Sequence, residues 1–358
     1  MAQMRRRAMS RRQIKQIAII GAGLAGAACA NIFAREGYSV TVYEQASTPA
    51  SGASGVPIAL FAPSISSDDA PHSRLLRQGV HVMMDELKRL TGASLMQEGV
   101  DWAVTGVLER CIRADKKLPP TWLAPQDPLG LQSKVLGDPY SVRPLGKVQE
   151  LFHGAAGWVH PQRLIAAWLT HPLIELKLQS RICDVAGLDA DVVVVACGFQ
   201  SPELLPSLTE LLQPIRGQAE WGASPVRAPL ANAVSDFPVN GMGHFIQTPD
   251  TWVAGATFQR DEMDLTPRAK DVDKNFEKLA ILLPELTNPE LVRLRAESTS
   301  WVGVRTAQKN RQPMVTQLDP NRYPNLWICT GLGSRGVSLA ALCAGSLLAS
   351  VQHSLALG

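Results

Sequence analysis

The most informative hydrophobic pattern is an apolar run that leads through closely spaced glycines into a helical spacing of apolar residues. It occurs at residues 17–35 and again at residues 325–350, near the two ends of the chain. A third apolar run, residues 190–198, has the unbroken valine content of a strand that is buried on both faces. The three runs predict strands of an α/β, Rossmann-like layer, with helices after the first and the last.

The middle of the chain departs from the strand-helix alternation of a free-standing NAD dehydrogenase. A helical pattern covers residues 74–90, and a further helix is expected to begin at Pro161, because proline suits the first helical position. Strand-like pieces cover residues 100–111, 213–221, 243–248 and 252–258. This region predicts a second domain of antiparallel-sheet α+β type.

The first glycine-rich turn is a G-x-G-x-x-G dinucleotide fingerprint. Gly21 permits the tight turn, Gly23 lets the backbone approach a pyrophosphate, and Gly26 lets the helix pack closely on the strand. Glu44 ends the next strand, where a carboxylate can bind ribose hydroxyls and repels a 2′-phosphate. The turn therefore predicts NAD or FAD rather than NADP, without separating the two.

The second glycine-rich turn, residues 331–336, favours FAD. Its backbone N–H groups can face a second electron-rich part of one long ligand, and the isoalloxazine ring gains negative charge on reduction. The alternative is an ordinary turn that closes the sheet edge. The residues expected to bind FAD are Gly21, Ala22, Gly23, Leu24, Ala25, Gly26, Glu44, Gln45, Ala53, Ser54, Gly198, Gly331, Gly333, Ser334, Arg335, Gly336 and Val337.

These assignments predict two interwoven domains. The FAD-binding domain is expected to be discontinuous and to comprise residues 15–95, 155–210 and 322–352. The substrate domain is expected to comprise residues 96–154 and 211–321.

Composition changes this picture little. With 46% hydrophobic and 19% charged residues, the chain is expected to be a globular cytoplasmic protein. No uninterrupted apolar run approaches the roughly 18 residues of a membrane-spanning helix. The six cysteines form no C-x-x-C pair, so we expect reduced thiols and no metal site.

The charge is concentrated in residues 1–14 and Lys15. The whole chain has a net charge of +3. Without the six basic residues of this stretch, the rest of the chain has 29 basic and 32 acidic residues and is slightly acidic. Residues 1–14 are expected to be a disordered arm, with contact to RNA phosphates or a membrane surface as the alternative.

With these residues assembled, the chain resembles the D-amino-acid-oxidase family of FAD oxidoreductases, which includes glycine oxidase and sarcosine oxidase. Within the family it resembles the C-terminal FAD domain of bifunctional tRNA-modification proteins over residues 15–350. The stretches that carry this resemblance are "GASGVPIALFAP", "GWVHPQRL", "AGATFQRDEMDL", "GVRTAQKNRQPMV" and "GLGSRGVSLAALCA".

The resemblance implies an enzyme that acts on CH–NH donors. It implies removal of the carboxymethyl group from 5-carboxymethylaminomethyluridine at the tRNA wobble position, with release of glyoxylate. It also implies tRNA rather than DNA as partner, and a separate methyltransferase for the later step. The alternatives are oxidation of a small free amino acid or N-methyl amino acid, and flavin binding without turnover. The slightly acidic body favours the small substrate.

Two arginines suit the substrate carboxylate, because a guanidinium matches two oxygens at once. The resemblance places Arg305 at the carboxylate and Arg335 beside the flavin. The alternatives are a salt bridge for Arg305 and a structural role in the glycine-rich loop for Arg335. Gln308 and Asn310 depart from the Thr and Asp usual in the family.

Other candidate residues have a structural interpretation. His160 and His244 lie near family stretches, but neither has a readable acidic partner, and a lone histidine is more often a hydrogen-bonded core residue. Four tryptophans are expected in the core, with base stacking as the alternative: Trp158, Trp221, Trp252 and Trp301.

Overall fold

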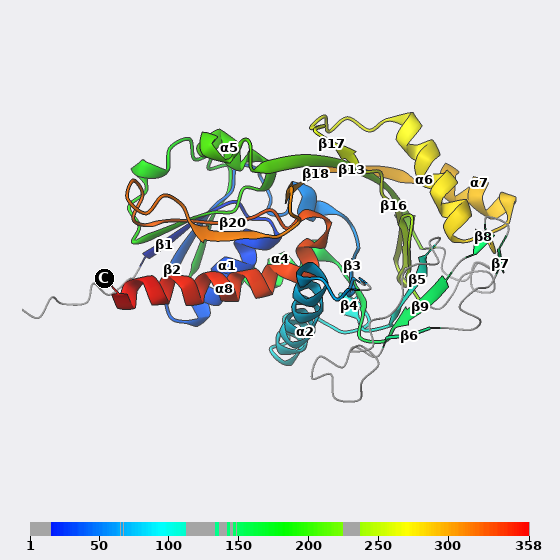
Figure 1. Cartoon of the computed structure of the whole chain (residues 1–358), viewed down its shortest axis with the longest axis horizontal. Helices are drawn as coiled ribbons and strands as arrows, with labels where there is room; N and C mark the ends of the chain where they lie inside the picture. Colours follow the sequence, from blue (N-terminus) through cyan, green and yellow to red (C-terminus); the bar gives the residue numbers. More distant parts are fainter. Residues whose placement is uncertain are drawn as a thin grey trace, which may run out of the picture.

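A six-stranded, mainly parallel sheet forms one half of the molecule (Figure 1). The computed structural model describes residues 16–111, 133–135, 142–143, 146–147, 149–224 and 237–357, apart from 65 and 67. The expected N-terminal arm, residues 1–14, lies outside the described residues. In spatial order, the strands are β11 (Ile174–Lys177), β2 (Ser39–Tyr43), β1 (Gln16–Ile20), β12 (Val192–Val195), β20 (Leu326–Thr330) and β19 (Met314–Gln317).

The pairing in this sheet confirms the predicted Rossmann-like layer. β1 lies between β2 and β12, and all neighbours are parallel except β19 and β20. Every residue of β12 and β20 is buried, as their apolar runs indicate. β19 falls in the range expected for the substrate domain, yet its hydrogen bonds join it to this sheet.

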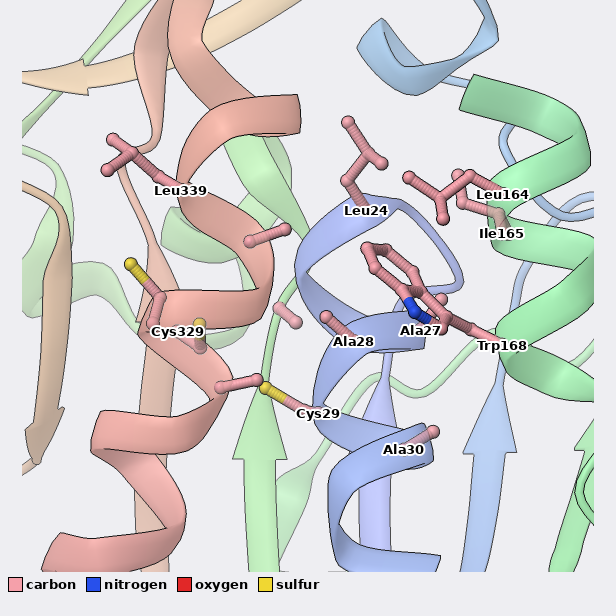
Figure 2. Packing of buried hydrophobic residues seen from close by; sticks show 14 of the residues in the cluster. Leu24, Ala27, Ala28, Cys29, Ala30, Leu164, Ile165, Trp168, Cys329 and Leu339 are labelled. Carbon is pink, nitrogen blue, oxygen red and sulfur yellow. The ribbon is translucent and has the colours of Figure 1, made fainter. Parts of the chain in front are cut away.

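Helices cover the sheet through small side chains. α1 (Leu24–Arg35) contacts both α8 (Gly336–Leu357) and α4 (Pro161–Leu169), and α2 (Pro71–Gly92) also packs on α8. Figure 2 shows Ala27, Ala28 and Ala30 of α1 in this core. Alanine side chains let the helix axes approach closely, and the larger Trp168 and Leu164 of α4 fill the space beside them.

One apolar helical segment is long enough to cross a membrane. Among the described residues, Gly333–Ser354 meets this test of length and composition, although the sequence analysis found no adequate run. In this structure the segment lies against α1 and α2, and 50% of its most apolar window is buried inside the protein. The absence of a membrane span stays a prediction.

A nine-stranded sheet forms the other half, and it confirms the expected antiparallel-sheet domain. β18 (Thr299–Gln308) takes one edge of the long β13 (Leu212–Ala223), and β16 and β17 share the other. Neighbours are antiparallel except β14 and β5. The other strands are β5 (Val107–Cys111), β6 (Ser133–Val135), β9 (Gln149–His153), β14 (Val239–Asn240), β15 (His244–Gln247), β16 (Thr251–Gly255) and β17 (Gln259–Arg260).

Two helices pack on this second sheet. α6 (Ala269–Leu282) contacts β13, β15 and β16, and α7 (Asn288–Ala296) contacts α6. α7 begins with a capping box in which Thr287 and Glu290 satisfy each other's backbone N–H groups. The remaining elements are short: α5 (Ser201–Leu204), β3 (Ala59–Phe61), β4 (Trp102–Ala103), β10 (Gly157–Val159), β7 (Val142–Arg143) and β8 (Gly146–Lys147).

β13 and β18 connect the two halves (Figure 1). β18 contacts three short 3₁₀ turns: η1 (Ala53–Gly55), η3 (Gly198–Gln200) and η6 (Gly333–Arg335). Each of these turns carries residues expected to bind FAD. The pairing of β13 with β18 therefore brings the second domain against the nucleotide-binding turns.

Candidate active site

A cavity of about 700 Å³ runs along the junction of the two halves. Of the residues expected to bind FAD, all except Ala22 and Gly26 line it. Arg305 lines it as well. Residues predicted from opposite ends of the chain therefore share one elongated cavity, as a long ligand requires.

The first glycine-rich turn has the expected geometry. Gly21 has a φ of +104°, and its N–H donates to the carbonyl of Tyr43 at 2.8 Å. A Cβ on Gly26 would lie 1.9 Å from the carbonyl oxygen of Gly21. Gly26 and the fully buried Ala22 therefore contribute by packing beneath the turn rather than by lining the cavity.

Glu44 is held at the wall of the cavity by two backbone N–H groups. Its carboxylate oxygens accept hydrogen bonds from Ala22 and Ala46, each at 2.9 Å. Each carboxylate oxygen retains acceptor capacity beyond these bonds, so ribose hydroxyls can still bind there. Its neighbour Gln45 donates to the side chain of Gln200 at 2.7 Å.

Ser54 connects the loop after Glu44 to the nucleotide-binding helix. Its hydroxyl accepts a hydrogen bond from the N–H of Leu24 at 3.0 Å. This bond satisfies one of the free N–H groups at the start of α1 and fixes η1 beside it. Ser54 therefore positions the loop in addition to lining the cavity.

Two buried threonines give a test of whether this cavity fits a polar cofactor. The hydroxyls of Thr306 and Thr330 are buried without a hydrogen-bond partner in the described structure, and both residues line the cavity. Unsatisfied buried hydroxyls are costly unless a ligand completes them. Thr330 directly precedes Gly331, and the hydroxyl of Thr306 lies 3.8 Å from where a Cβ on Gly198 would be. Gly331 and Gly333 have φ values of +76° and +57°. These residues fit the polar edge of a flavin ring, and sequence reasoning had no local signal for either threonine.

Three cationic side chains line the cavity close to His244: Arg305, Arg335 and Lys278. Neither guanidinium group forms a hydrogen bond or ion pair with any residue that the structure describes. Burial lowers the pKa of both, although the negative charge of Glu109 opposes this shift at Arg335. The Nζ of Lys278 donates to the carbonyl of Ala256 at 2.9 Å. The salt bridge considered for Arg305 is absent among the described residues, which leaves its charge for an anionic ligand.

His244 also lies in the cavity. Burial lowers its pKa to about 4, helped by the positive charges of Arg305, Arg335 and Lys278. The imidazole is therefore neutral at neutral pH and can accept a hydrogen bond. The core role expected for this histidine is wrong, because tertiary packing places it among the cationic side chains.

His160, in contrast, has the structural role that was expected. It is buried outside the cavity lining, and its Nδ1 is 2.8 Å from the carbonyl oxygen of Pro57. Trp158 and Trp252 are buried core residues, and Trp221 is partly buried. Trp301 is also partly buried, but it lines the cavity.

Two departures from the family pattern, Gln308 and Asn310, do not line the cavity. The side chain of Gln308 donates to the carbonyl of Gln312 at 2.9 Å. The side chain of Asn310 accepts a hydrogen bond from the backbone N–H of Gln312, also at 2.9 Å. Both polar side chains stabilise their own turn. Neither lines the cavity, so their identity does not change its charge.

The cysteines form no metal-binding group in the described part of the chain, although Cys183 is an exposed free thiol that lines the cavity. Cys29, Cys329 and Cys343 are buried free thiols. Cys197 lines the cavity, but burial raises its pKa to about 12, so it stays protonated. The described residues contain no group of three or more His, Cys, Asp or Glu side chains placed to hold a metal ion.

Comparisons with known proteins agree with this site. The family model described as FAD dependent oxidoreductase (DAO) matches residues 16–350. Proteins named tRNA 5-methylaminomethyl-2-thiouridine biosynthesis bifunctional protein MnmC, from Polaromonas sp. strain JS666 and Paracidovorax citrulli, are 38% and 35% identical over 96% and 93% of this chain. The match covers 57% of each relative, so the chain spans little more than half of their length.

Solved structures show the same fold. Glycine oxidase from Geobacillus kaustophilus has a TM-score of 0.74 at 17% identity, with 95% of each chain covered. Iminodiacetate oxidase from Chelativorans sp. BNC1 has a TM-score of 0.72 at 20% identity, with 94% of this chain and 95% of that chain covered. The chain therefore belongs to the DAO family of FAD-dependent oxidoreductases, and its cofactor is FAD.

Proposed function

We propose that this protein oxidises the C–N bond of a glycine-like secondary amine, the carboxymethylaminomethyl group of the tRNA wobble uridine, and releases glyoxylate. The observation that carries the proposal is a pair of guanidinium groups, Arg305 and Arg335, in the cavity that the cofactor residues line. Neither has a hydrogen bond or ion pair to another residue in the part of the chain that the structure describes. The MnmC relatives, whose names specify tRNA modification, support the nucleoside as substrate. A tRNA substrate places the reaction in the cytoplasm.

The reaction needs three contributions from the chain. The guanidinium of Arg305 binds the substrate carboxylate and so orients the adjacent CH₂ group for oxidation. Bound FAD supplies the chemistry of accepting the hydride that this CH₂ group loses. The amine must be neutral before hydride loss, and the positive charges of Arg305, Arg335 and Lys278 disfavour its protonated form. The neutral imidazole of His244 can accept a hydrogen bond from the amine N–H.

The products follow from the balance of atoms. Loss of a hydride from carbon and a proton from nitrogen leaves an imine of glyoxylate. Water adds to the imine carbon, and cleavage of the C–N bond gives the aminomethyl nucleoside and glyoxylate. The cations Arg305, Arg335 and Lys278 keep the carboxylate bound during hydrolysis.

The test uses purified, FAD-loaded protein and tRNA that carries carboxymethylaminomethyluridine. We expect anaerobic loss of the oxidised flavin absorbance, formation of the aminomethyl nucleoside by mass spectrometry, and an equal amount of glyoxylate. Reduction of the flavin by N-methylglycine but not by this tRNA would instead support a small free amine as substrate.

A further inference from the structure

Three large apolar side chains of the cavity lining remain exposed. Met242, Phe258 and Leu265 all line the cavity, and they are 47%, 51% and 54% exposed. Met242 lies in the turn before His244, and Phe258 and Leu265 lie before and after β17. We refer to these three residues as the apolar rim. Exposed apolar surface that adjoins a binding cavity commonly marks contact with a ligand.

The apolar rim is attached to a rigid base. Arg216, which is fully buried, donates to the carbonyl oxygens of Asp264 and Thr266 at 2.5 and 2.7 Å, on the two sides of Leu265. Arg216 also forms an ion pair at 2.6 Å with the buried Asp271. Leu265 is thus held in an exposed position by bonds from the protein interior.

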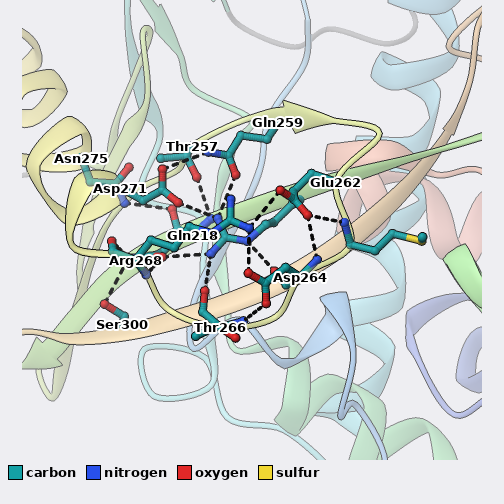
Figure 3. A network of polar contacts seen from close by, with 12 residues as sticks. Gln218, Thr257, Gln259, Glu262, Asp264, Thr266, Arg268, Asp271, Asn275 and Ser300 are labelled. Atoms are coloured by element: carbon teal, nitrogen blue, oxygen red, sulfur yellow. Dashed lines mark hydrogen bonds and ion pairs between the residues drawn. The ribbon is translucent and has the colours of Figure 1, made fainter.

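Phe258 is held in the same way. Its neighbour Thr257 accepts a hydrogen bond from the N–H of Gln218 at 2.9 Å, and Gln259 accepts one from Arg216 at 2.9 Å. Figure 3 shows Gln218, Thr257 and Gln259 in one network of polar contacts. Because these hydrogen bonds fix the chain on both sides of Phe258 and of Leu265, the two exposed side chains are presented without the ordering cost of a mobile loop.

The acidic side chains of this loop bind within the protein. Arg268 donates to both Glu262 and Asp264, at 2.9 and 2.7 Å, and Asp261 accepts from Gln213 at 3.0 Å. The guanidinium of Arg260 lies 5.4 Å from the centre of the Phe258 ring. An aromatic ring with an adjacent cation suits a flat, electron-rich group that is attached to a phosphate backbone.

We infer that the apolar rim binds the nucleobase of the substrate, with the base stacked against Phe258 and flanked by Leu265 and Met242. The inference rests on the proposed function and specifies how the site selects a nucleoside. A small free amino acid would be held by Arg305 inside the cavity and would leave the rim exposed. In the proposed substrate, a short chain of single bonds connects the nucleobase to the carboxylate. The base therefore covers the apolar rim while the amine lies beside Arg305, Arg335 and Lys278.

The experiment compares two substrates in four variants of the full-length, FAD-loaded protein. The substrates are N-methylglycine and an anticodon stem-loop that carries carboxymethylaminomethyluridine. The variants are Phe258→Ala, Leu265→Ala, the conservative Phe258→Trp, and the control Val292→Ala, which changes an exposed apolar residue of α7 outside the cavity. The measurements are kcat/KM for each substrate and the Kd of labelled stem-loop by fluorescence anisotropy.

For Phe258→Ala we expect kcat/KM for the stem-loop to fall about 10-fold or more and its Kd to rise by a similar factor, since base stacking on an aromatic residue has this magnitude. For N-methylglycine, kcat/KM should stay within about twofold, because the carboxylate contacts are unchanged. Leu265→Ala should also lower kcat/KM for the stem-loop, by a smaller factor than Phe258→Ala. Phe258→Trp and Val292→Ala should retain stem-loop oxidation.

Equal losses on the two substrates, or no loss on either, would overturn the role of the apolar rim while leaving the proposed function in place. A wild-type protein that oxidises N-methylglycine and leaves the stem-loop unchanged would overturn the proposed function, and the inference with it. The two failures are therefore distinguishable by the wild-type result alone.

Discussion

The guanidinium of Arg305 occupies the space that a side chain at position 217 would fill, and Gly217 leaves that space free. A Cβ on Gly217 would lie 2.5–2.8 Å from three guanidinium atoms. The two residues belong to paired strands, in which Arg305 is opposite Ile215 on β13. The absence of a side chain at position 217 thus determines where the guanidinium of Arg305 lies. This guanidinium is the group that we propose binds the substrate carboxylate.

Gly217→Ala should therefore weaken substrate binding without unfolding the protein. We expect KM for an N-substituted glycine to rise about 10-fold, because the displaced guanidinium loses charged hydrogen bonds of about 1.5–3 kcal/mol. Steady-state kinetics and thermal unfolding would measure the two effects. Gly187→Ala is the control, since a Cβ there has nothing within 4 Å. A normal KM in Gly217→Ala would contradict this account.

Arg305→Ala should separate a ligand-binding role from a structural one. The guanidinium has no partner in the described structure, so its loss should leave the Tm of the apoprotein unchanged or raised. In contrast, kcat/KM should fall at least about 100-fold, and Arg305→Lys should recover little because an ammonium lacks the planar fork of donors. A lowered Tm with retained activity would indicate a structural ion pair.

Gly26→Ala should prevent FAD binding. The new methyl group would overlap the carbonyl of Gly21 and push α1 away from the turn. We expect purified Gly26→Ala to lack flavin absorbance and to stay colourless after incubation with FAD. Gly345→Ala in α8 serves as the control, because its nearest neighbour would be Ile32 at 3.8 Å. Full flavin content in Gly26→Ala would refute the assigned packing.

His244 should make the apoprotein less stable in acid. Its pKa is about 4 in the folded protein against 6.5 for an unperturbed histidine, so the unfolded chain binds its proton first as the pH falls. The free energy of unfolding should decrease between about pH 6.5 and pH 4, by about 1–2 kcal/mol once screening by cavity water is allowed for.

The measurement is urea unfolding of wild type and His244→Gln at neutral pH and near pH 5. His72 and His160 also have lowered pKa values, so the difference between the two proteins isolates the contribution of His244. The variant should lose less stability in acid than wild type. Parallel curves would show that His244 is already solvated or charged in the folded protein.

Parts of the site with a local signature were predictable from the sequence. Gly21, Gly23 and Gly26 act within one strand-turn-helix unit, and their spacing is dictated by that unit. Glu44 ends the next strand, and β1 and β2 are parallel neighbours with Ile20 opposite Tyr43. The glycine-rich turn before α8 was visible for the same reason, because a short stretch contains all of its geometry.

Tertiary structure decided the substrate end. Lys278, His244 and Arg305 come from α6, β15 and β18, and nothing in their separate sequence contexts indicates that they meet. The same holds for Gly217 beneath Arg305 and for the buried network that presents Phe258. The sequence by itself determined the cofactor turns, because their function depends on backbone conformation over a few consecutive residues. Charge, burial and pKa at the substrate end depend on distances between remote strands, and only the folded sheet establishes those distances.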